Sequence, residues 1–286
     1  MRHTTRTSLL ALLVALLSAL LVVPAAAVSG GASAGVSAGV LGGDPPGAND
    51  WDCVPTVKRP TPVILVHGTM GDRKNLLEGL SRSIKSKGFC VFSLDYGDRG
   101  LSDIRASAKQ LKRYTKRVLR ATGASKVSMV GHSQGGLMPR YLIKFLRGKK
   151  LVDDLVGIAP SNHGTAFVGG DNPISALVAA IVNGPCRACV QQGAGSPFLT
   201  RLNQGDETPG RVNYTQITTR YDQVVVPHTS GYLTEGRRTT NLTLQDLCPT
   251  SLAEHVTVPL ATPTIDIVLD ALTRRGPASK KVSPRC

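Results

Sequence analysis

Apolar residues along this chain follow two alternating patterns. In the first, nearly every position of a short run is apolar, as in Val63–Val66 and Val152–Ile158, which is typical of strands buried on both faces of a parallel sheet. In the second, apolar positions recur at helical spacing over a longer stretch, as expected for a helix with one buried face. The predicted strands cover residues 63–66, 89–94, 126–130, 152–158, 214–219 and 240–244. The predicted helices cover residues 75–87, 102 or 103 to about 121, 135–146 and 264–272.

Strands and helices alternate along the chain, and this alternation predicts the fold class. Repeated strand–helix units form a mainly parallel sheet with helices on both faces, so we expect an α/β fold. The alternation is interrupted at residues 159–211, which contain one more short predicted helix at 174–182 and a pair of cysteines. We interpret this stretch as an insertion at the strand ends, where segments that cover a substrate are usually found.

The first 27 residues have the pattern of a signal peptide. A basic start at Arg2 and Arg6 precedes an apolar run from Ser8 to Val23, and the small residues of Pro24–Ala27 follow, which predicts cleavage after Ala27. The alternative is a membrane anchor, but the run has about 16 residues where spanning a bilayer takes about 20. No later apolar run is long enough to span a membrane, so we expect a secreted protein. The further divisions that we predict are a flexible Gly/Ala/Ser-rich leader at 28–50, a globular catalytic domain at 51–275 and a C-terminal tail at 276–286.

The chain is strongly basic, with a formal net charge of +15. Cleavage after residue 27 removes two arginines and no acidic residue, which leaves +13. A basic surface attracts anionic lipid, cell wall or nucleic acid. In this chain, however, few aromatic residues lie between the basic ones, and there is no nucleic-acid-binding motif. We therefore expect no nucleic-acid partner and interpret the basic predicted helix as a solvated face. Its basic residues are Arg105, Lys109, Lys112, Arg113, Lys116, Arg117 and Arg120.

Six cysteines in an exported chain indicate three disulfides. Several pairings are open, and the sequence alone does not select one. A Cys-x-x-Cys pair also occurs in redox centres and zinc sites, but no second Cys or His pair at ligand spacing accompanies the one found here. We therefore expect this cysteine pair to form a structural disulfide that closes a small loop, and we expect no metal. The pairs that chain proximity favours are Cys53 with Cys90, Cys186 with Cys189, and Cys248 with Cys286.

The pattern Gly-x-Ser-x-Gly occurs three times. Two overlapping matches at residues 31–39 lie in the leader, with no strand before them and no helix after them. The third match, Gly131–Gly135, directly follows a predicted strand and precedes a predicted helix, which is the context that turns the serine into an exposed nucleophile. Small residues at both ends let strand and helix pass closely, and the helix N-terminus places N–H groups near developing negative charge. We therefore expect Ser133 to be a catalytic nucleophile.

A serine hydroxyl needs a base that removes its proton. Of the histidines after the nucleophile, His163 lies in the insertion and His228 lies in a loop. His255 lies between the last predicted strand and the last predicted helix, where the base belongs when the order is serine, acid, histidine. We therefore expect His255 to be the base. The two histidines before the nucleophile, interpreted as loop and turn scaffolding, are His67 and His132.

The acid should end a strand between the nucleophile and the base. Asp222 and Asp246 both end predicted strands, so order alone does not separate them. Asp222 is followed by an apolar stretch that would bury its surroundings, whereas Asp246 adjoins Cys248 and Pro249, which fix a loop without needing a catalytic carboxylate. We therefore expect Asp222 to be the acid, with Asp246 as its rival.

An acyl-transfer site also needs two donors for the oxyanion. One is the backbone N–H of the residue after the nucleophile, Gln134. The other comes from the loop after the first core strand, residues 67–71, where we expect the backbone N–H of Thr69 to be the donor and its hydroxyl to be a candidate third one. The alternative is a simple turn built on Gly68 and Gly71.

Four segments together resemble a known family. They are Val63–Thr69 (VILVHGT), Gly131–Gly136 (GHSQGG), Tyr221–Val225 (YDQVV) and Glu254–His255. In order, spacing and context they are similar to the secreted bacterial lipases and esterases of lipase class 2, especially those of actinobacteria. The resemblance covers roughly residues 51–272. It implies a compact, near-minimal α/β-hydrolase fold, with Ser133, Asp222 and His255 on the family's triad and Thr69 and Gln134 on its oxyanion positions.

The resemblance also implies an activity. Members hydrolyse carboxylic esters, often acylglycerols, through an acyl-enzyme and without a cofactor, so we expect a lipase or esterase whose partner is an ester or lipid at a lipid–water interface, acting as a monomer. Two alternatives keep the chemistry: a cutinase-like or polyester-degrading esterase, and an acyltransferase. A third, a non-catalytic protein that binds an apolar ligand or the cell wall, would not need the complete serine, acid, histidine order.

Overall fold

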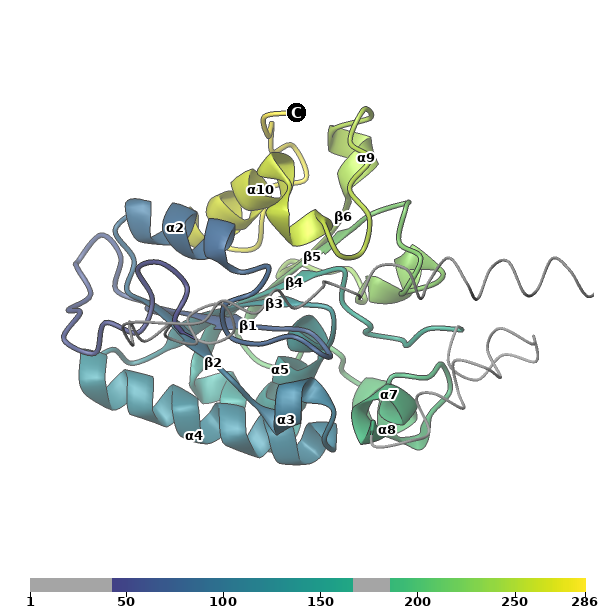
Figure 1. The fold of residues 1–286 in the computed structure, drawn as a ribbon, viewed down its shortest axis with the longest axis horizontal. Coiled ribbons are helices and arrows are strands. Elements are labelled where there is room, and N and C mark those ends of the chain that lie inside the picture. The colour runs from purple at the N-terminus through teal and green to yellow at the C-terminus, as the bar shows by residue number, and fades with distance from the viewer. Residues whose placement is uncertain (1–42, 167–185) are drawn as a thin grey trace, which may run out of the picture. The chain divides into compact units, whose positions relative to one another are not determined.

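A six-stranded sheet lies at the centre of the part of the chain that the structure describes (Figure 1). In chain order its strands are β1 (Val63–Val66), β2 (Val91–Leu94), β3 (Val127–His132), β4 (Val152–Ile158), β5 (Asn213–Thr218) and β6 (Thr239–Thr243). The order across the sheet is β2–β1–β3–β4–β5–β6, and every neighbouring pair is parallel. Nearly all strand residues are buried, which explains the short apolar runs of the sequence.

The computed structural model describes residues 43–166 and 186–286. The predicted signal peptide, most of the predicted leader and the helix predicted at 174–182 lie outside the described residues.

Helices cover both faces of this sheet. The longer ones are α2 (Glu78–Ser86), α4 (Ile104–Thr122), α5 (Gln134–Phe145) and α10 (Thr262–Thr273), and the short ones are α3 (Gly97–Gly100), η1 (Gly148–Lys150), α7 (Arg187–Gln191), α8 (Pro197–Asn203), η2 (His228–Gly231), α9 (Leu244–Leu247) and η3 (Val258–Leu260). Helices α2 and α10 lie on one face, and α4 and α5 lie on the other (Figure 1). The predicted α/β class, a parallel sheet between two helical layers, is confirmed.

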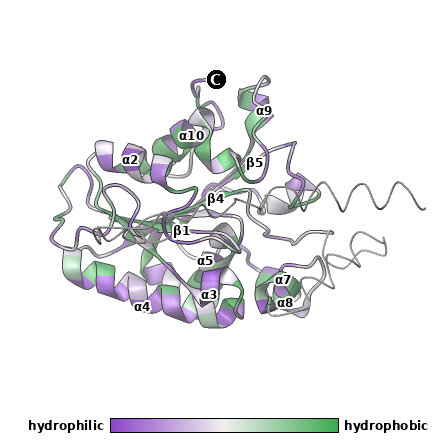
Figure 2. Ribbon diagram, in the orientation of Figure 1, coloured by the Kyte–Doolittle hydropathy of each residue, from purple (hydrophilic) through white to green (hydrophobic). Residues whose placement is uncertain are grey.

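Each face of the sheet has its own apolar core. Phe92 and Met129 belong to the cluster on the side of α4 and α5, and Leu65 and Ile267 belong to the cluster on the side of α2 and α10. A fully buried side chain of this kind contributes roughly 2 kcal/mol to stability. Figure 2 shows hydrophilic residues along α4, and its predicted basic side chains are exposed or partly exposed. The sheet therefore receives apolar surface from both layers, and the basic face of α4 points to solvent.

Every predicted element that falls within the described residues appears, with ends that differ by at most three residues. Helix α4 begins as expected, because the Asp103 carboxylate accepts hydrogen bonds from the Arg105 and Ala106 N–H groups. Helix α2 begins three residues later than expected. The reason is that the Asp72 carboxylate accepts from the N–H groups of Lys74 and Asn75, which folds this segment into a turn of its own.

The predicted leader ends earlier than expected. The sequence pattern assigns residues 43–50 to the leader, but Ala48 forms a bridge with Val91 of β2. The Asn49 side chain donates to the Ser93 carbonyl oxygen and accepts from the Ser93 N–H. These contacts hold this stretch against the sheet because its polar side chains satisfy the backbone of the edge strand.

The insertion at 159–211 contributes helices α7 and α8 in its described part, and both lie below the carboxyl ends of the strands in Figure 1. The Ala188 N–H donates to the Leu101 carbonyl oxygen at 3.1 Å. The Gln191 side chain accepts from the N–H of Ile104 at 2.7 Å, at the start of α4. Helix α7 is therefore anchored to the loop that precedes α4.

The structure contains the three disulfides that chain proximity favoured, namely Cys53–Cys90, Cys186–Cys189 and Cys248–Cys286. The last one ties the end of the chain to the segment after α9. Within residues 43–166 and 186–286, no helix has the length and apolar character that crossing a membrane requires.

Candidate active site

Ser133 lies in a sharp turn between β3 and α5. Its backbone has φ 54° and ψ −125°, a strained region for a residue with a side chain. A Cβ atom at Gly131 would overlap the Gly135 carbonyl group, and one at Gly135 would overlap the Val66 carbonyl group. The two glycines are therefore required for strand and helix to pass this closely, as the sequence pattern suggested. The turn aims the serine side chain out of the carboxyl edge of the sheet.

Two loops bring the predicted acid and base to this serine. Strand β5 ends at Thr218, so the expectation that a strand runs to Asp222 was wrong, and the carboxylate lies in the loop beyond. That loop is paired with the one that carries His255 by a bridge between Tyr221 and Glu254. The Gln223 side chain adds a hydrogen bond to the Glu254 carboxylate at 2.8 Å. The acid and the base are thus neighbours although a strand and a helix separate them in sequence.

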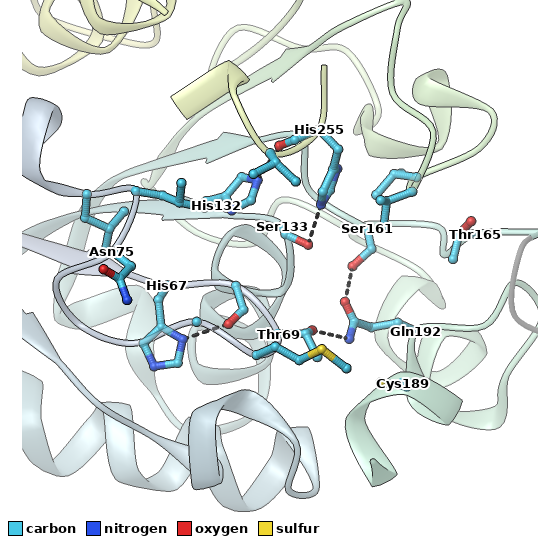
Figure 3. Close-up of a pocket in the computed structure, with 18 residues that line it drawn as sticks. His67, Thr69, Asn75, His132, Ser133, Ser161, Thr165, Cys189, Gln192 and His255 are labelled. Atoms are coloured by element: carbon cyan, nitrogen blue, oxygen red, sulfur yellow. Dashed lines mark hydrogen bonds between the residues drawn. The ribbon is translucent and has the colours of Figure 1, made fainter. Parts of the chain in front are cut away.

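The three side chains form a continuous hydrogen-bonded line. His255 Nε2 lies 3.1 Å from Ser133 Oγ, and His255 Nδ1 lies 2.9 Å from Asp222 Oδ2. The other carboxylate oxygen of Asp222 accepts from the N–H groups of Val224 and Val225 at 2.9 and 2.7 Å. Since all three side chains are buried, their geometry is fixed by neighbours. Figure 3 shows His255 pointing at Ser133.

The rival residues lie elsewhere. Asp246 belongs to α9 and pairs with Arg220 at the surface. His163 Nε2 lies 2.7 Å from the Glu207 carboxylate, and His228 Nδ1 lies 3.2 Å from the Thr218 hydroxyl. The structure therefore brings none of these three alternatives to Ser133.

His132 and His67 support the site through other contacts than one with the Ser133 hydroxyl. Burial lowers the pKa of His132 to about 3, so this imidazole is neutral. Its Nε2 lies 2.8 Å from the His255 carbonyl oxygen, to which the ring N–H donates. Burial also lowers the pKa of His67, whose ring stacks on Tyr96 with 4.3 Å between centroids. His132 therefore holds the backbone of the base loop, and His67 holds the loop of Thr69.

The two expected oxyanion donors flank Ser133. Gln134 is the first residue of α5, and Thr69 follows Gly68, where an added Cβ would lie 3.0 Å from the Ser133 Cβ. The next N–H along the loop, that of Met70, donates to the Arg99 carbonyl oxygen at 2.7 Å. Among the described residues, the N–H groups of Thr69 and Gln134 have no such acceptor. Both are therefore available to an oxyanion on Ser133.

A cavity of about 400 Å³ opens at these residues (Figure 3). Its wall combines the Ser133 and His255 side chains with apolar residues of three loops. Met70, Val224 and Val256 at its edge are 57%, 41% and 48% exposed. Such a cavity fits an apolar chain attached to a reacting carbonyl group. Within the described part of the chain, no group of three or more His, Cys, Asp or Glu side chains is arranged to hold a metal ion.

Two polar residues of this site, Gln192 and Ser161, are not predictable from the sequence pattern. Gln192 Nε2 lies 3.0 Å from Thr69 Oγ1, and its Oε1 accepts from Ser161 Oγ at 2.8 Å (Figure 3). Both residues come from the insertion, and nothing in the local sequence separates Gln192 from its neighbour Gln191. Only the docking of α7 identifies which glutamine reaches the site.

Comparison with known proteins agrees with this geometry. Residues 60–265 match the family described as Lipase (class 2). Triacylglycerol lipases of Pseudarthrobacter phenanthrenivorans and Burkholderia plantarii are each 37% identical over 112 residues, which are 37% of this chain and 34% and 31% of theirs. Lipase B of Aspergillus fumigatus aligns with a TM-score of 0.64 at 24% identity, over 77% of this chain and 53% of that one. The chain thus spans about a third of the length of the two bacterial relatives.

The sheet order, the strained serine turn and the structural likeness define an α/β-hydrolase fold. The family match covers 206 of the 286 residues. The chain belongs to the lipase class 2 family.

Proposed function

We propose that this protein is a carboxylic-ester hydrolase, a lipase that cleaves acylglycerols through an acyl-enzyme on Ser133. The observation that carries the proposal is the hydrogen-bonded line from Asp222 through His255 to Ser133 at the edge of an apolar cavity. Membership of lipase class 2 and the triacylglycerol lipases among the relatives support it.

In the proposed reaction His255 Nε2 takes the Ser133 proton as Oγ bonds to the ester carbonyl carbon. Asp222 holds the imidazole through Nδ1 and stabilises its charged form. The imidazolium then donates its proton to the alcohol oxygen, and the bond between that oxygen and the carbonyl carbon breaks. Water, deprotonated by His255, then attacks the acyl carbon. The bond between that carbon and Ser133 Oγ breaks, the imidazolium returns its proton to Oγ, and the carboxylic acid leaves.

The negative oxygen of each tetrahedral intermediate would be bound by the backbone N–H groups of Thr69 and Gln134. Donors fixed before the reaction are worth about 3 kcal/mol each in such a site. Both N–H groups lie beside Ser133 without a backbone acceptor among the described residues, which supports this assignment.

The apolar cavity favours the acyl chain of a lipid as the substrate group. The exposed apolar side chains of Met70, Val224 and Val256 at its edge are suited to contact with a lipid–water interface. A lipid substrate is therefore favoured over a small, soluble ester.

An ester panel of increasing acyl length, run on wild type and Ser133→Ala, tests the proposal. We expect wild type to hydrolyse the panel and to react with a serine-directed phosphonate, and Ser133→Ala to lose both properties at an unchanged melting temperature. Ser86→Ala, which changes an exposed serine at the end of α2, is the matched control with full activity. Ser133→Ala activity above a few per cent of wild type would reject the assignment, since losing a triad member costs orders of magnitude.

We further propose that residues 1–27 are a signal peptide and that the enzyme is secreted. The basic start, apolar run and small residues before Val28 support this. Intact mass of the protein from the medium of a secreting bacterial host measures the cleavage point. We expect a chain that starts at Val28. A cell-bound protein that keeps its first 27 residues would contradict the proposal.

A further inference from the structure

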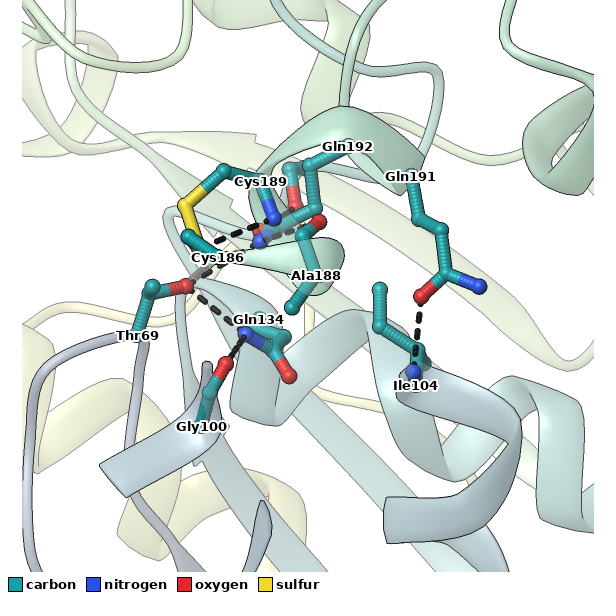
Figure 4. The surroundings of a disulfide bond; sticks show 10 residues. Thr69, Gly100, Ile104, Gln134, Cys186, Ala188, Cys189, Gln191 and Gln192 are labelled. Atoms are coloured by element: carbon teal, nitrogen blue, oxygen red, sulfur yellow. Dashed lines mark hydrogen bonds between the residues drawn. A yellow bond between two sulfur atoms is a disulfide. The ribbon is translucent and has the colours of Figure 1, made fainter. Parts of the chain in front are cut away.

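The Thr69 hydroxyl accepts hydrogen bonds from two side-chain amides. Gln134 Nε2 lies 2.8 Å and Gln192 Nε2 lies 3.0 Å from Thr69 Oγ1 (Figure 4). Each amide nitrogen also donates to a backbone carbonyl oxygen, that of Gly100 at 2.7 Å and that of Ala188 at 3.2 Å. Because a carbonyl oxygen only accepts, it identifies the amide atom that faces it as nitrogen. Both amides therefore donate to the threonine.

Two incoming hydrogen bonds leave the Thr69 hydroxyl able to act as a donor through its proton. A threonine hydroxyl has two lone pairs and one proton, and both lone pairs of Thr69 Oγ1 are now engaged. Among the described residues, this hydroxyl donates to no acceptor. Thr69 lines the cavity together with Ser133. Its proton is therefore available to a negatively charged oxygen that forms there.

Gln192 is held firmly in its place. It is 7% exposed, and its Oε1 accepts from Ser161 Oγ at 2.8 Å. Its backbone N–H donates to the Ala188 carbonyl oxygen at 3.0 Å. The Cys186–Cys189 disulfide closes the turn immediately before it (Figure 4). The insertion thus presents one amide to Thr69 in a single orientation.

We propose that Gln192 is a positioning residue that fixes the Thr69 hydroxyl as a third donor to the oxyanion. This inference rests on the proposed esterase function. Gln134 contributes its own backbone N–H to the oxyanion, whereas Gln192 acts only through Thr69. A donor that is oriented before the reaction stabilises the transition state without having to reorganise. The insertion therefore contributes to catalysis through Gln192.

The test is a double-mutant cycle on the secreted enzyme with a 4-nitrophenyl ester, with kcat and KM measured separately. The variants are Gln192→Met, Thr69→Val and the pair, and Gln192→Met is also made in a Thr69→Ser background that keeps the hydroxyl. Gln204→Met, at an exposed glutamine of the same insertion, is the matched control. Thermal melting of every variant establishes that it is folded.

We expect Gln192→Met to lower kcat about tenfold, the value of one neutral hydrogen bond, with KM nearly unchanged. Thr69→Val should lower kcat about 100-fold, as the loss of an oxyanion donor does. In the Thr69→Val background Gln192→Met should cost nothing more, whereas in the Thr69→Ser background it should again cost about tenfold. Gln204→Met should behave as wild type.

An equal loss from Gln192→Met in the Thr69→Val background would overturn the inference, because Gln192 would then act elsewhere. A rise in KM alone would also overturn it, since it would make Gln192 a substrate contact. Full kcat in folded Gln192→Met would overturn this inference and leave the esterase function standing. A wild-type enzyme without ester hydrolysis would overturn both.

Discussion

Replacing Asp222 by asparagine should reverse the proton arrangement of the proposed base. Asp222 Oδ1 accepts from two backbone N–H groups, so the amide oxygen of the substituted side chain must occupy that place. The amide NH₂ then faces His255 Nδ1, where Oδ2 lies 2.9 Å away in the native protein. Because an NH₂ group can only donate, the imidazole must carry its proton on Nε2. That nitrogen faces Ser133 Oγ and can no longer accept its proton.

The size of the expected loss in kcat follows from this change of the His255 tautomer. The side chain of Asp222 is 1% exposed and that of His255 is 6% exposed, so water does not replace the missing acceptor. The loss of an orienting carboxylate in a serine triad costs about 10⁴ in kcat, and we expect up to that loss here. The fold should be kept, because the amide preserves the shape of the side chain and both backbone hydrogen bonds.

Asp246→Asn is the matched control. Its side chain is 55% exposed and pairs with Arg220, and exposed ion pairs contribute little, so kcat should fall by less than about tenfold. Kinetics of both purified variants at pH 8, with melting temperatures, provide the measurement. A large loss at Asp246, or a loss below about tenfold at Asp222, would refute the assignment of the acid.

Three further predictions concern the fold. Peptide mapping without reduction should recover Cys248 linked to Cys286. The variant with serine at both positions should lose up to about 4 kcal/mol of stability, since the bond closes a long loop of the unfolded chain. Free thiols in the mature protein would contradict this pairing. Burial raises the pKa of Asp154 to about 6, so the folded protein holds this proton more tightly than the unfolded chain, and stability should fall as pH rises from about 4 to 6. Asp154→Asn should remove this pH dependence of stability. Urea unfolding at pH 7.5 should show the variant to be more stable than wild type by up to about 3 kcal/mol. An unchanged pH profile of stability in the variant would disprove the prediction. Gly131→Ala should yield no folded protein, because its Cβ would overlap a backbone carbonyl group, and a soluble variant with native melting would show that the turn can relax.

The architecture and the sharp turn that carries the candidate nucleophile could be predicted from local sequence. A buried parallel strand must be apolar along its whole length, so runs such as Val152–Ile158 identify the sheet without knowledge of their partners. Ser133 is recognisable because the strand, the turn and the helix around it are consecutive in the chain, and the two glycines are demanded by contacts within that unit and with the adjacent strand. Chain order then selected His255 as the candidate base, and its Nε2 lies 3.1 Å from Ser133 Oγ.

The sequence could not show how separate loops meet. It favours Asp222 over Asp246 only through the apolar stretch that follows Asp222, whereas the contact itself comes from the bridge between Tyr221 and Glu254, which brings Asp222 to the imidazole. Likewise Gln191 and Gln192 are adjacent and chemically identical, yet one caps α4 and the other reaches Thr69. Which of these residues reaches the site depends on the long-range packing of α7 and of the loops beyond the strands. The sequences of these loops carry no periodic pattern. The physical reason is that local propensity and burial determine the elements of this protein. The pairing of its proposed catalytic and supporting side chains is determined only when distant loops dock on the same edge of the sheet.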